Sequence, residues 1–139
     1  MKSYTDISQS KKLAEILPLE SADMCYLPTH IGDEHHFIAS LSSYSECTKM
    51  VEVSIEYCIP CWSLTSLLSV LPQSITKYIE GESCQKTFHL NLFRSYYHCV
   101  SYSFTPSVND DNTLYCIGRD NWVDACVAMI EKLNELNLL

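Results

Sequence analysis

The sequence predicts an α+β fold, namely a single two-layer domain over residues 1–139 in which about three helices cover a mainly antiparallel sheet. Several short segments alternate apolar and polar residues and follow one another across short polar turns, which is typical of antiparallel strands. Three other stretches carry apolar residues at helical spacing. No change in composition along the 139 residues marks a boundary between two domains.

The predicted helices cover residues 7–17, 62–71 and 121–136. Asp6 can cap the first helix, and Gln9 three residues later completes a capping box. Ser63 and Asn121 can cap the second and the third. The second helix has an apolar stripe with the spacing i, i+3, i+4, i+7, formed by Leu64, Leu67, Leu68 and Leu71.

The predicted strands cover residues 22–27, 36–41, 50–57, 75–80, 87–93, 96–104 and 113–118. The segment 50–57 alternates strictly, and its apolar face consists of Val51, Val53, Ile55 and Tyr57. Polar segments at residues 28–35, 42–48 and 105–112 are predicted to be loops. The segment 81–86 separates two strands and is predicted to close a hairpin.

Charge and hydropathy restrict the classes of partner. The formal net charge is −8, and the nine Lys and Arg residues are scattered, which argues against binding to nucleic acid or to an anionic membrane. No stretch approaches 18 apolar residues, and the polar first twenty residues do not resemble a signal peptide. We therefore expect a cytoplasmic protein whose eight cysteines are thiols.

Cys58 and Cys61 form a CxxC pair between a predicted strand and a predicted helix. A thiol at a helix N-terminus has a lowered pKa, so this arrangement is compatible with thiol-disulfide redox chemistry, and Thr105-Pro106 is similar to the proline loop beside such sites. However, Trp62 follows the second cysteine, and the later hairpins do not fit a thioredoxin-like fold. The alternative is a pair of buried structural cysteines.

No metal, cofactor or catalytic group is predicted. One CxxC supplies two ligands, whereas a structural zinc site needs about four. The pairs His35-His36 and His98-Cys99 consist of strand neighbours, whose side chains point to opposite faces. No nucleophile elbow or phosphate-binding loop occurs in the sequence.

The aromatic segment from Phe93 to Phe104 contains three tyrosines and one arginine. Aromatic residues on a sheet usually fill a core or form cross-strand pairs, but exposed ones are common in protein interfaces. If their side chains point outward, Arg94 and Tyr97 are the candidates for a contact surface.

Three segments, "ADM" at 22–24, "IPCWSLTSLLSVLP" at 59–72 and "DNWVDACVAMIEKL" at 120–133, resemble a group of small proteins encoded in phage-like and other mobile elements of gut bacteria. No activity is established for that group. The resemblance implies one fold along the chain and a mobile-element context. Its shared pattern includes Ile59, Pro60 and Trp62 but neither cysteine, which implies that a CxxC active site is not the common function.

These observations favour a non-enzymatic accessory protein that acts by binding another protein or by self-association. The alternative is a redox protein that uses Cys58 and Cys61. In the favoured interpretation, a set of residues at the helix entries has a structural role, and these are Pro60, Trp62, Leu64, Leu68 and Trp122.

Overall fold

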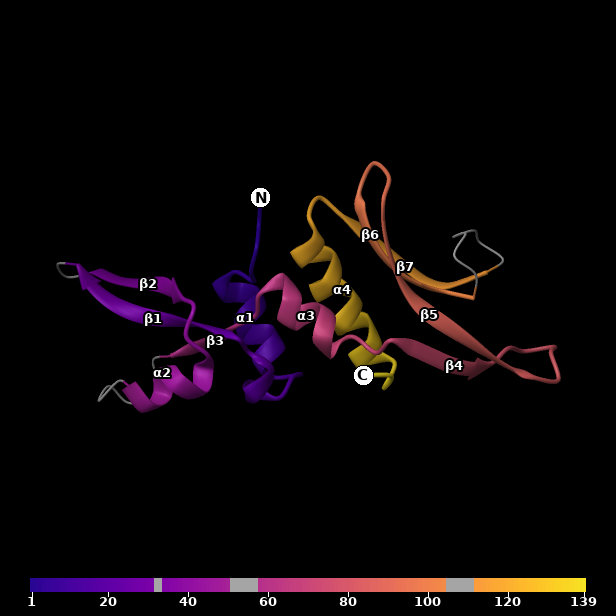
Figure 1. Cartoon of the computed structure of the whole chain (residues 1–139), viewed down its shortest axis with the longest axis horizontal. Coiled ribbons are helices and arrows are strands. Elements are labelled where there is room, and N and C mark those ends of the chain that lie inside the picture. Colours follow the sequence, from indigo (N-terminus) through magenta and orange to yellow (C-terminus); the bar gives the residue numbers. More distant parts are fainter. Residues whose placement is uncertain (32–33, 51–57, 105–111) are drawn as a thin grey trace. The chain divides into compact units, whose positions relative to one another are not determined.

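The computed structural model describes residues 1–31, 34–50, 58–104 and 112–139 (Figure 1). By its internal contacts the chain divides into two compact units, an N-terminal unit of residues 2–70 and a C-terminal unit of residues 71–139 with Met1. Both units combine helices with antiparallel strands, which confirms the α+β prediction. The described strands form two sheets, whereas one sheet was predicted. That residues 1–139 form a single domain stays a prediction.

The N-terminal unit contains a three-stranded antiparallel sheet in the order β2-β1-β3. The strands are β1 (Met24–Ile31), β2 (Glu34–Ser40) and β3 (Ile59–Cys61). The helices are α1 (Ile7–Ala14), the short 3-10 helix η1 (Leu19–Ser21), α2 (Tyr44–Met50) and α3 (Leu64–Val70).

The register of this sheet places a helix on each of its faces. Met24 lies opposite Cys61 and Tyr26 opposite Ile59, and Ile7 at the start of α1 packs against this face. Cys25 points to the other face, where its thiol meets that of Cys47 from α2. Helix α1 contacts β3, and α2 contacts β1 and β3. Helices α1 and α2 therefore cover opposite faces of this sheet.

The C-terminal unit is a four-stranded antiparallel meander in the order β4-β5-β6-β7. Its elements are β4 (Ser74–Tyr78), β5 (Gln85–Arg94), β6 (His98–Ser103), β7 (Thr113–Arg119) and α4 (Trp122–Glu135). Helix α4 packs on β6 and β7. This unit has the predicted two layers, with one helix against one sheet face.

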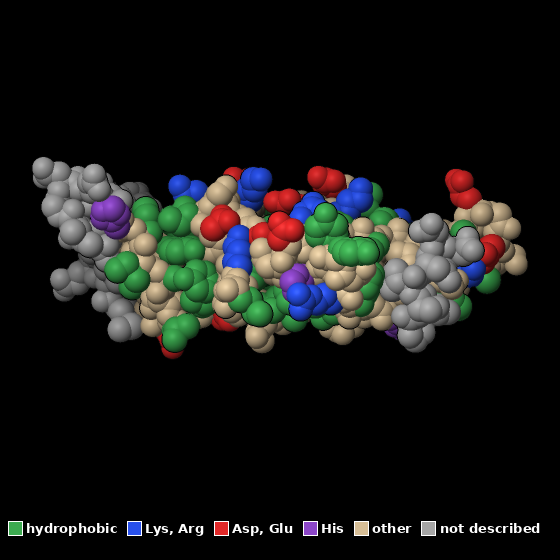
Figure 2. Space-filling model, turned by 90° about the horizontal axis from the view of Figure 1, so that it is seen from above, with side chains coloured by type: hydrophobic (Ala, Val, Ile, Leu, Met, Phe, Trp, Pro, Cys, Tyr) green, Lys and Arg blue, Asp and Glu red, His purple; other side chains and the backbone are tan. Residues whose placement is uncertain are grey.

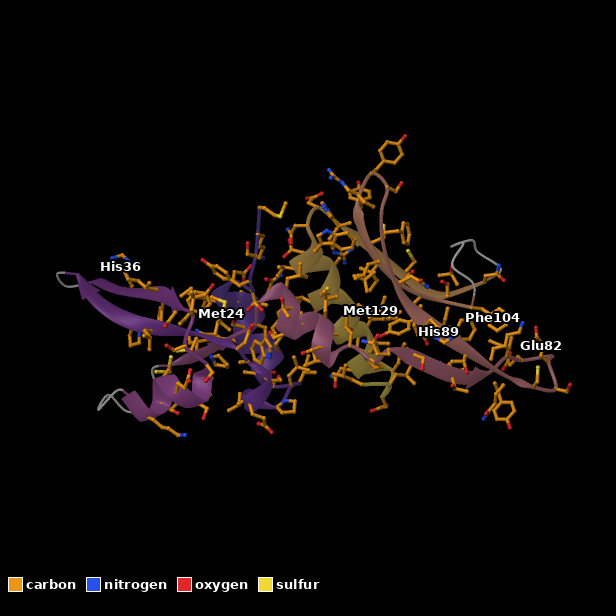
Figure 3. All side chains as sticks on the ribbon, in the orientation of Figure 1. Met24, His36, Glu82, His89, Phe104 and Met129 are labelled. Carbon is orange, nitrogen blue, oxygen red and sulfur yellow. The ribbon has the colours of Figure 1, made fainter. Side chains whose placement is uncertain are left out.

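The core of the C-terminal unit lies between α4 and the face of the four-stranded sheet on which α4 packs. Val100 and Tyr102 alternate with residues of the opposite face, and both are fully buried. Met129, labelled on α4 in Figure 3, is also fully buried. The Tyr102 hydroxyl donates a hydrogen bond to the Pro72 carbonyl at 2.6 Å, so burial of the ring leaves its polar group paired.

The predicted helices exist, with shifted ends. The first ends at Ala14, although the Leu17 N–H still bonds the Leu13 carbonyl at 2.7 Å. The second begins at Leu64 because the residues before it are a strand. The third covers Trp122–Glu135, and its predicted cap is confirmed, since the Asn121 side chain accepts from the Asp124 N–H at 2.9 Å.

Two predicted loops are wrong. Residues 28–35 were predicted to be a loop, but β1 and β2 continue into them. Residues 42–48 were also predicted to be a loop, but they contribute most of α2. Ser43 and Glu46 form a capping box there, with the Ser43 N–H donating to Glu46 at 3.0 Å and the Glu46 N–H donating to Ser43 at 3.2 Å. The alternating segment 51–57 lies outside the described residues.

Candidate functional site

Cys58 and Cys61 lie at the two ends of a short strand. Cys61 is the last residue of β3, Cys58 directly precedes this strand, and α3 begins three residues after Cys61 at Leu64. Cys61 lies opposite Met24 of β1, whereas Cys58 interacts with Cys25 and Cys47. The two thiols of the CxxC pair therefore have different surroundings.

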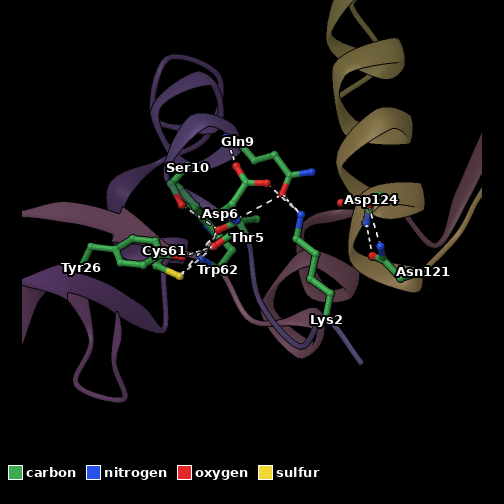
Figure 4. Close-up of polar contacts among 10 residues, drawn as sticks. All are labelled: Lys2, Thr5, Asp6, Gln9, Ser10, Tyr26, Cys61, Trp62, Asn121 and Asp124. Atoms are coloured by element: carbon green, nitrogen blue, oxygen red, sulfur yellow. Dashed lines mark hydrogen bonds and ion pairs between the residues drawn. The ribbon is translucent and has the colours of Figure 1, made fainter. Parts of the chain in front are cut away.

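Cys61 is fully buried among the polar groups of the segment before α1. Its Sγ lies 3.6 Å from both the hydroxyl and the carbonyl oxygen of Thr5, as Figure 4 shows. Burial raises the pKa of the Cys61 thiol, and the hydrogen bonds of Thr5, Ser10 and Tyr26 offset this only in part. A buried thiol with a raised pKa is a weak nucleophile at neutral pH.

Cys58 belongs to a separate cluster of three buried thiols, which also contains Cys25 and Cys47. Burial raises the pKa of the Cys58 thiol, and the neighbouring Cys47 raises it further. Burial likewise raises the pKa of Cys25, which interacts with both of the other thiols. Cys25 and Cys58 therefore remain protonated at neutral pH, where a thiol behaves as a small apolar group.

The segments "ADM" and "WSL" are joined directly by hydrogen bonds, although they lie 40 positions apart. The Asp23 carboxylate accepts the Ser63 N–H at 2.8 Å and also the Ser63 hydroxyl. Ser63 in turn accepts the Ser66 N–H at 3.3 Å in the first turn of α3. Asp23 thus fixes the cap of α3, which gives these two segments a structural explanation.

Trp62 and Thr5 form the centre of a buried hydrogen-bond network, of which the sequence indicated only Trp62. Trp62 is fully buried, as expected, and its indole N–H donates to the Ser21 hydroxyl at 2.9 Å. Thr5 was not singled out, although it is fully buried. Its hydroxyl lies 2.8 Å from that of Ser10 and accepts the Trp62 N–H at 3.1 Å (Figure 4). Tyr26 donates to the Thr5 carbonyl at 2.7 Å.

The other predicted structural residues are buried to differing degrees. Pro60 is buried, whereas Leu64 and Leu68 are half-buried. Trp122 is also half-buried, and its ring makes an edge-on contact with the His98 ring, with centroids 4.9 Å apart. This contact joins the start of α4 to the start of β6.

The turn between β5 and β6, residues 94–98, presents the predicted contact residues. Arg94 pairs with His98, and the Ser95 N–H bonds the Tyr97 carbonyl at 3.0 Å, which closes a tight hairpin. Arg94 and Tyr97 are both exposed. Tyr96, which was not singled out, is 99% exposed, and Tyr97 is 55% exposed. We call Arg94, Tyr96 and Tyr97 the tyrosine tip.

Gly118 of β7 supports the tyrosine tip from beneath. A Cβ atom at this position would lie 3.1 Å from the Tyr97 Cβ and 3.2 Å from the Cys99 Sγ. Any side chain at residue 118 would therefore press on Tyr97 and Cys99, which would have to move by a few tenths of an ångström. With the His98–Trp122 contact at its base, the tip is attached to rigid elements on two sides.

Across the described parts of the chain, no group of three or more His, Cys, Asp or Glu side chains is arranged to hold a metal ion. Within the same parts, no helix combines the length and apolar character needed to cross a membrane. On the face drawn in Figure 2, acidic and basic side chains are interspersed, without a large basic patch of the kind that binds nucleic acid.

Comparison of the chain with protein-family models, with curated proteins and with solved structures finds no match. The resemblance to proteins of mobile elements stays an expectation.

Asp23 gives a pH-dependent prediction. Burial alone would raise the pKa of its carboxyl, but the hydrogen bonds from Ser63 lower it below its usual value. A lowered pKa in the folded state stabilises the protein above the unfolded pKa, and this stabilisation is lost as the pH falls through the folded pKa. We expect Asp23→Ala to cost about 0.5–2 kcal/mol of unfolding free energy at pH 7.

The difference between wild type and Asp23→Ala should begin to shrink as the pH falls below about 4, where the carboxyl of the unfolded chain becomes protonated, and it should disappear below the lower pKa of the folded protein. Urea unfolding of both proteins at a series of pH values measures this difference in unfolding free energy. Asp23→Asn is the matched control, because it keeps an acceptor oxygen without the titrating charge. A difference for Asp23→Ala that does not change with pH would contradict the role of the carboxylate.

Proposed function

We propose that the protein is a non-enzymatic accessory factor of a mobile element, located in the cytoplasm, which acts by binding another protein or a second copy of itself through the tyrosine tip. The observation that carries this proposal is the exposure of two adjacent tyrosines, 99% for Tyr96 and 55% for Tyr97, beside an exposed arginine. Tyr and Arg are enriched among the residues that dominate binding energy.

The tip has the physical properties of a contact surface. Tyrosine supplies a large amphipathic area with only two rotatable side-chain bonds, so that little conformational entropy is lost on binding. The hairpin hydrogen bond fixes the backbone of the turn, and the first side-chain atoms of Tyr97 lie against Gly118 before a partner arrives. Such preorganisation lowers the cost of association.

The proposed cytoplasmic location is supported by the chemistry of the cysteines. All eight cysteines are free thiols, which are typical of a reducing compartment. The redox alternative at Cys58 and Cys61 has less support, because both thiols are buried and they have different neighbours, Cys47 and Cys25 for Cys58 and Thr5 for Cys61.

Tyr96→Ala should weaken association about tenfold or more and change the unfolding free energy by less than about 0.5 kcal/mol. Self-association is measured by sedimentation velocity over a range of protein concentrations. A heterologous partner is measured by quantitative capture from the native host with wild-type and variant protein in parallel.

The matched control for this experiment is Tyr78→Ala, which removes another exposed tyrosine, 71% exposed on β4. It should leave association unchanged. Equal association by wild type, Tyr96→Ala and the double variant Arg94→Ala/Tyr97→Ala would exclude the tip as the contact surface. A monomer that captures no specific protein would contradict the proposal as a whole.

A further inference from the structure

A second pair of cysteines lies on neighbouring strands of the C-terminal sheet. Cys99 on β6 is paired with Gly118 on β7, and Cys116 on β7 is paired with Ser101 on β6. Directly opposite residues of an antiparallel pair share a face, so both thiols lie on one face as diagonal neighbours. The register thus brings together two cysteines that are 17 positions apart in the sequence.

This face is the one turned away from α4. Val100 and Tyr102 alternate with Cys99 and Ser101 along β6, and Tyr102 interacts with Cys126 of α4. Because side chains alternate across a strand, Cys99 points to the opposite side. The pair is therefore not part of the core that α4 covers.

The two thiols are close enough to influence one another. After burial, the neighbouring Cys99 raises the pKa of Cys116. Gly118 leaves space for the Cys99 sulfur, which lies 3.2 Å from the position of a Cβ at residue 118. The Cys99 thiol also lies 3.7 Å from the Tyr97 carbonyl oxygen, to which it can donate.

Accessibility distinguishes this pair from the other cysteines. Cys116 is exposed, whereas Cys99 is only 8% exposed. Cys25, Cys47, Cys58, Cys61 and Cys126 are buried, and the remaining exposed cysteine, Cys84, lies in the loop between β4 and β5. The C-terminal pair thus combines an exposed thiol with a shielded thiol beside it.

We propose that Cys99 and Cys116 are the oxidisable dithiol of this protein and form a reversible cross-strand disulfide with a peroxide oxidant. The Cys116 thiolate attacks a peroxide oxygen, the O–O bond breaks, and a sulfenic acid and water form. The Cys99 thiol then attacks the Cys116 sulfur and displaces a second water molecule. Two thiols lose two electrons to one hydrogen peroxide molecule.

The product would link β7, the last strand in the sheet order, covalently to β6 directly beside the tyrosine tip. A sulfur–sulfur bond of about 2.05 Å requires the two sulfurs to approach one another further. An edge strand is paired on one side only, so β7 can shift more easily than a central strand. A dithiol reductant reverses the bond by thiol–disulfide exchange.

The test is the site of the first disulfide formed when reduced, folded protein is treated with equimolar hydrogen peroxide. The Cys84→Ser background avoids cross-links between molecules, and thiols are blocked with iodoacetamide before peptide mapping. We expect one linked peptide pair, Cys99 with Cys116, which dithiothreitol removes. Cys116→Ser should abolish it, and Cys61→Ser should leave its yield unchanged.

Cys99→Ala provides a second variant, because alanine places no polar hydroxyl at this shielded position. With Cys99 replaced, peroxide should drive Cys116 to a sulfenic acid that dimedone captures. A first disulfide at Cys58–Cys61 or within the Cys25, Cys47 and Cys58 cluster would overturn the proposal. Oxidation of wild-type Cys116 to a sulfinic acid while Cys99 remains alkylatable would overturn it as well.

Discussion

Replacing Trp62 with Ala should lower the free energy of unfolding by about 3–5 kcal/mol, the range found for the loss of a large core aromatic. Trp62 is fully buried, so its removal leaves a cavity between β3 and α3. The change also leaves the Ser21 hydroxyl without its 2.9 Å donor. Unfolding in urea, followed by far-ultraviolet circular dichroism, measures this loss.

Two further variants separate the causes of this loss. Trp62→Phe keeps an aromatic ring but lacks the indole N–H, so it should fall between wild type and Trp62→Ala. Tyr96→Ala removes an aromatic ring that is 99% exposed and should be nearly neutral. A nearly neutral Trp62→Ala would contradict the structural role of the junction between β3 and α3.

Signals local in the sequence predicted much of the fold. The capping box of Asp6 and Gln9 is present, with the Gln9 N–H donating to Asp6 at 2.9 Å and the Asp6 N–H donating to Gln9 at 3.2 Å. The apolar stripe of α4 is buried at Cys126, Met129 and Ile130. Caps and periodicity depend on residues within one or two turns, so the sequence displays them directly.

The N-terminal unit was harder to predict because its elements are short and depend on tertiary contacts. Strand β3 has three residues, too few to show an alternating pattern, and its pairing with β1 defines it. Helix α2 lies in a segment of serines, which favour turns as readily as helix caps. Only the Ser43–Glu46 capping box indicated a helix there.

The candidate site was also hard to predict, because its residues are brought together by contacts between distant parts of the sequence. The spacing of Cys58 and Cys61 is visible in the sequence, but the neighbours of each thiol depend on tertiary contacts, with β1 for Cys61 and with Cys25 and Cys47 for Cys58. The contact between Asp23 and Ser63 joins residues 40 positions apart, and that between Thr5 and Trp62 joins residues 57 apart. Contacts at such separations leave no local pattern in a single sequence.

The residues of the tyrosine tip could be predicted from the sequence only in part. Arg94 and Tyr97 could be proposed because the aromatic segment is conspicuous in the sequence. Tyr96 was assigned to a strand face, but it lies in the turn, where its side chain is almost fully exposed. Tyr96 lies in the turn because β5 ends at Arg94 and β6 begins at His98. Such strand ends are difficult to predict from sequence.

The central claim is that Cys58 and Cys61 are buried thiols with different neighbours and do not form a reactive pair. Alkylation of the folded protein near neutral pH, quantified at each cysteine by mass spectrometry, tests it most directly. Cys84 and Cys116 are exposed and should react first. Cys58 and Cys61 should react at least about a hundredfold more slowly, because reaction requires local or global opening of the fold.

In denaturant all eight cysteines should react at similar rates, which controls for intrinsic reactivity. Rapid alkylation of Cys58 or Cys61 in the folded protein, together with a reversible Cys58–Cys61 disulfide, would contradict the claim and restore the redox interpretation. Slow reaction of both is the result that the geometry of β3 predicts.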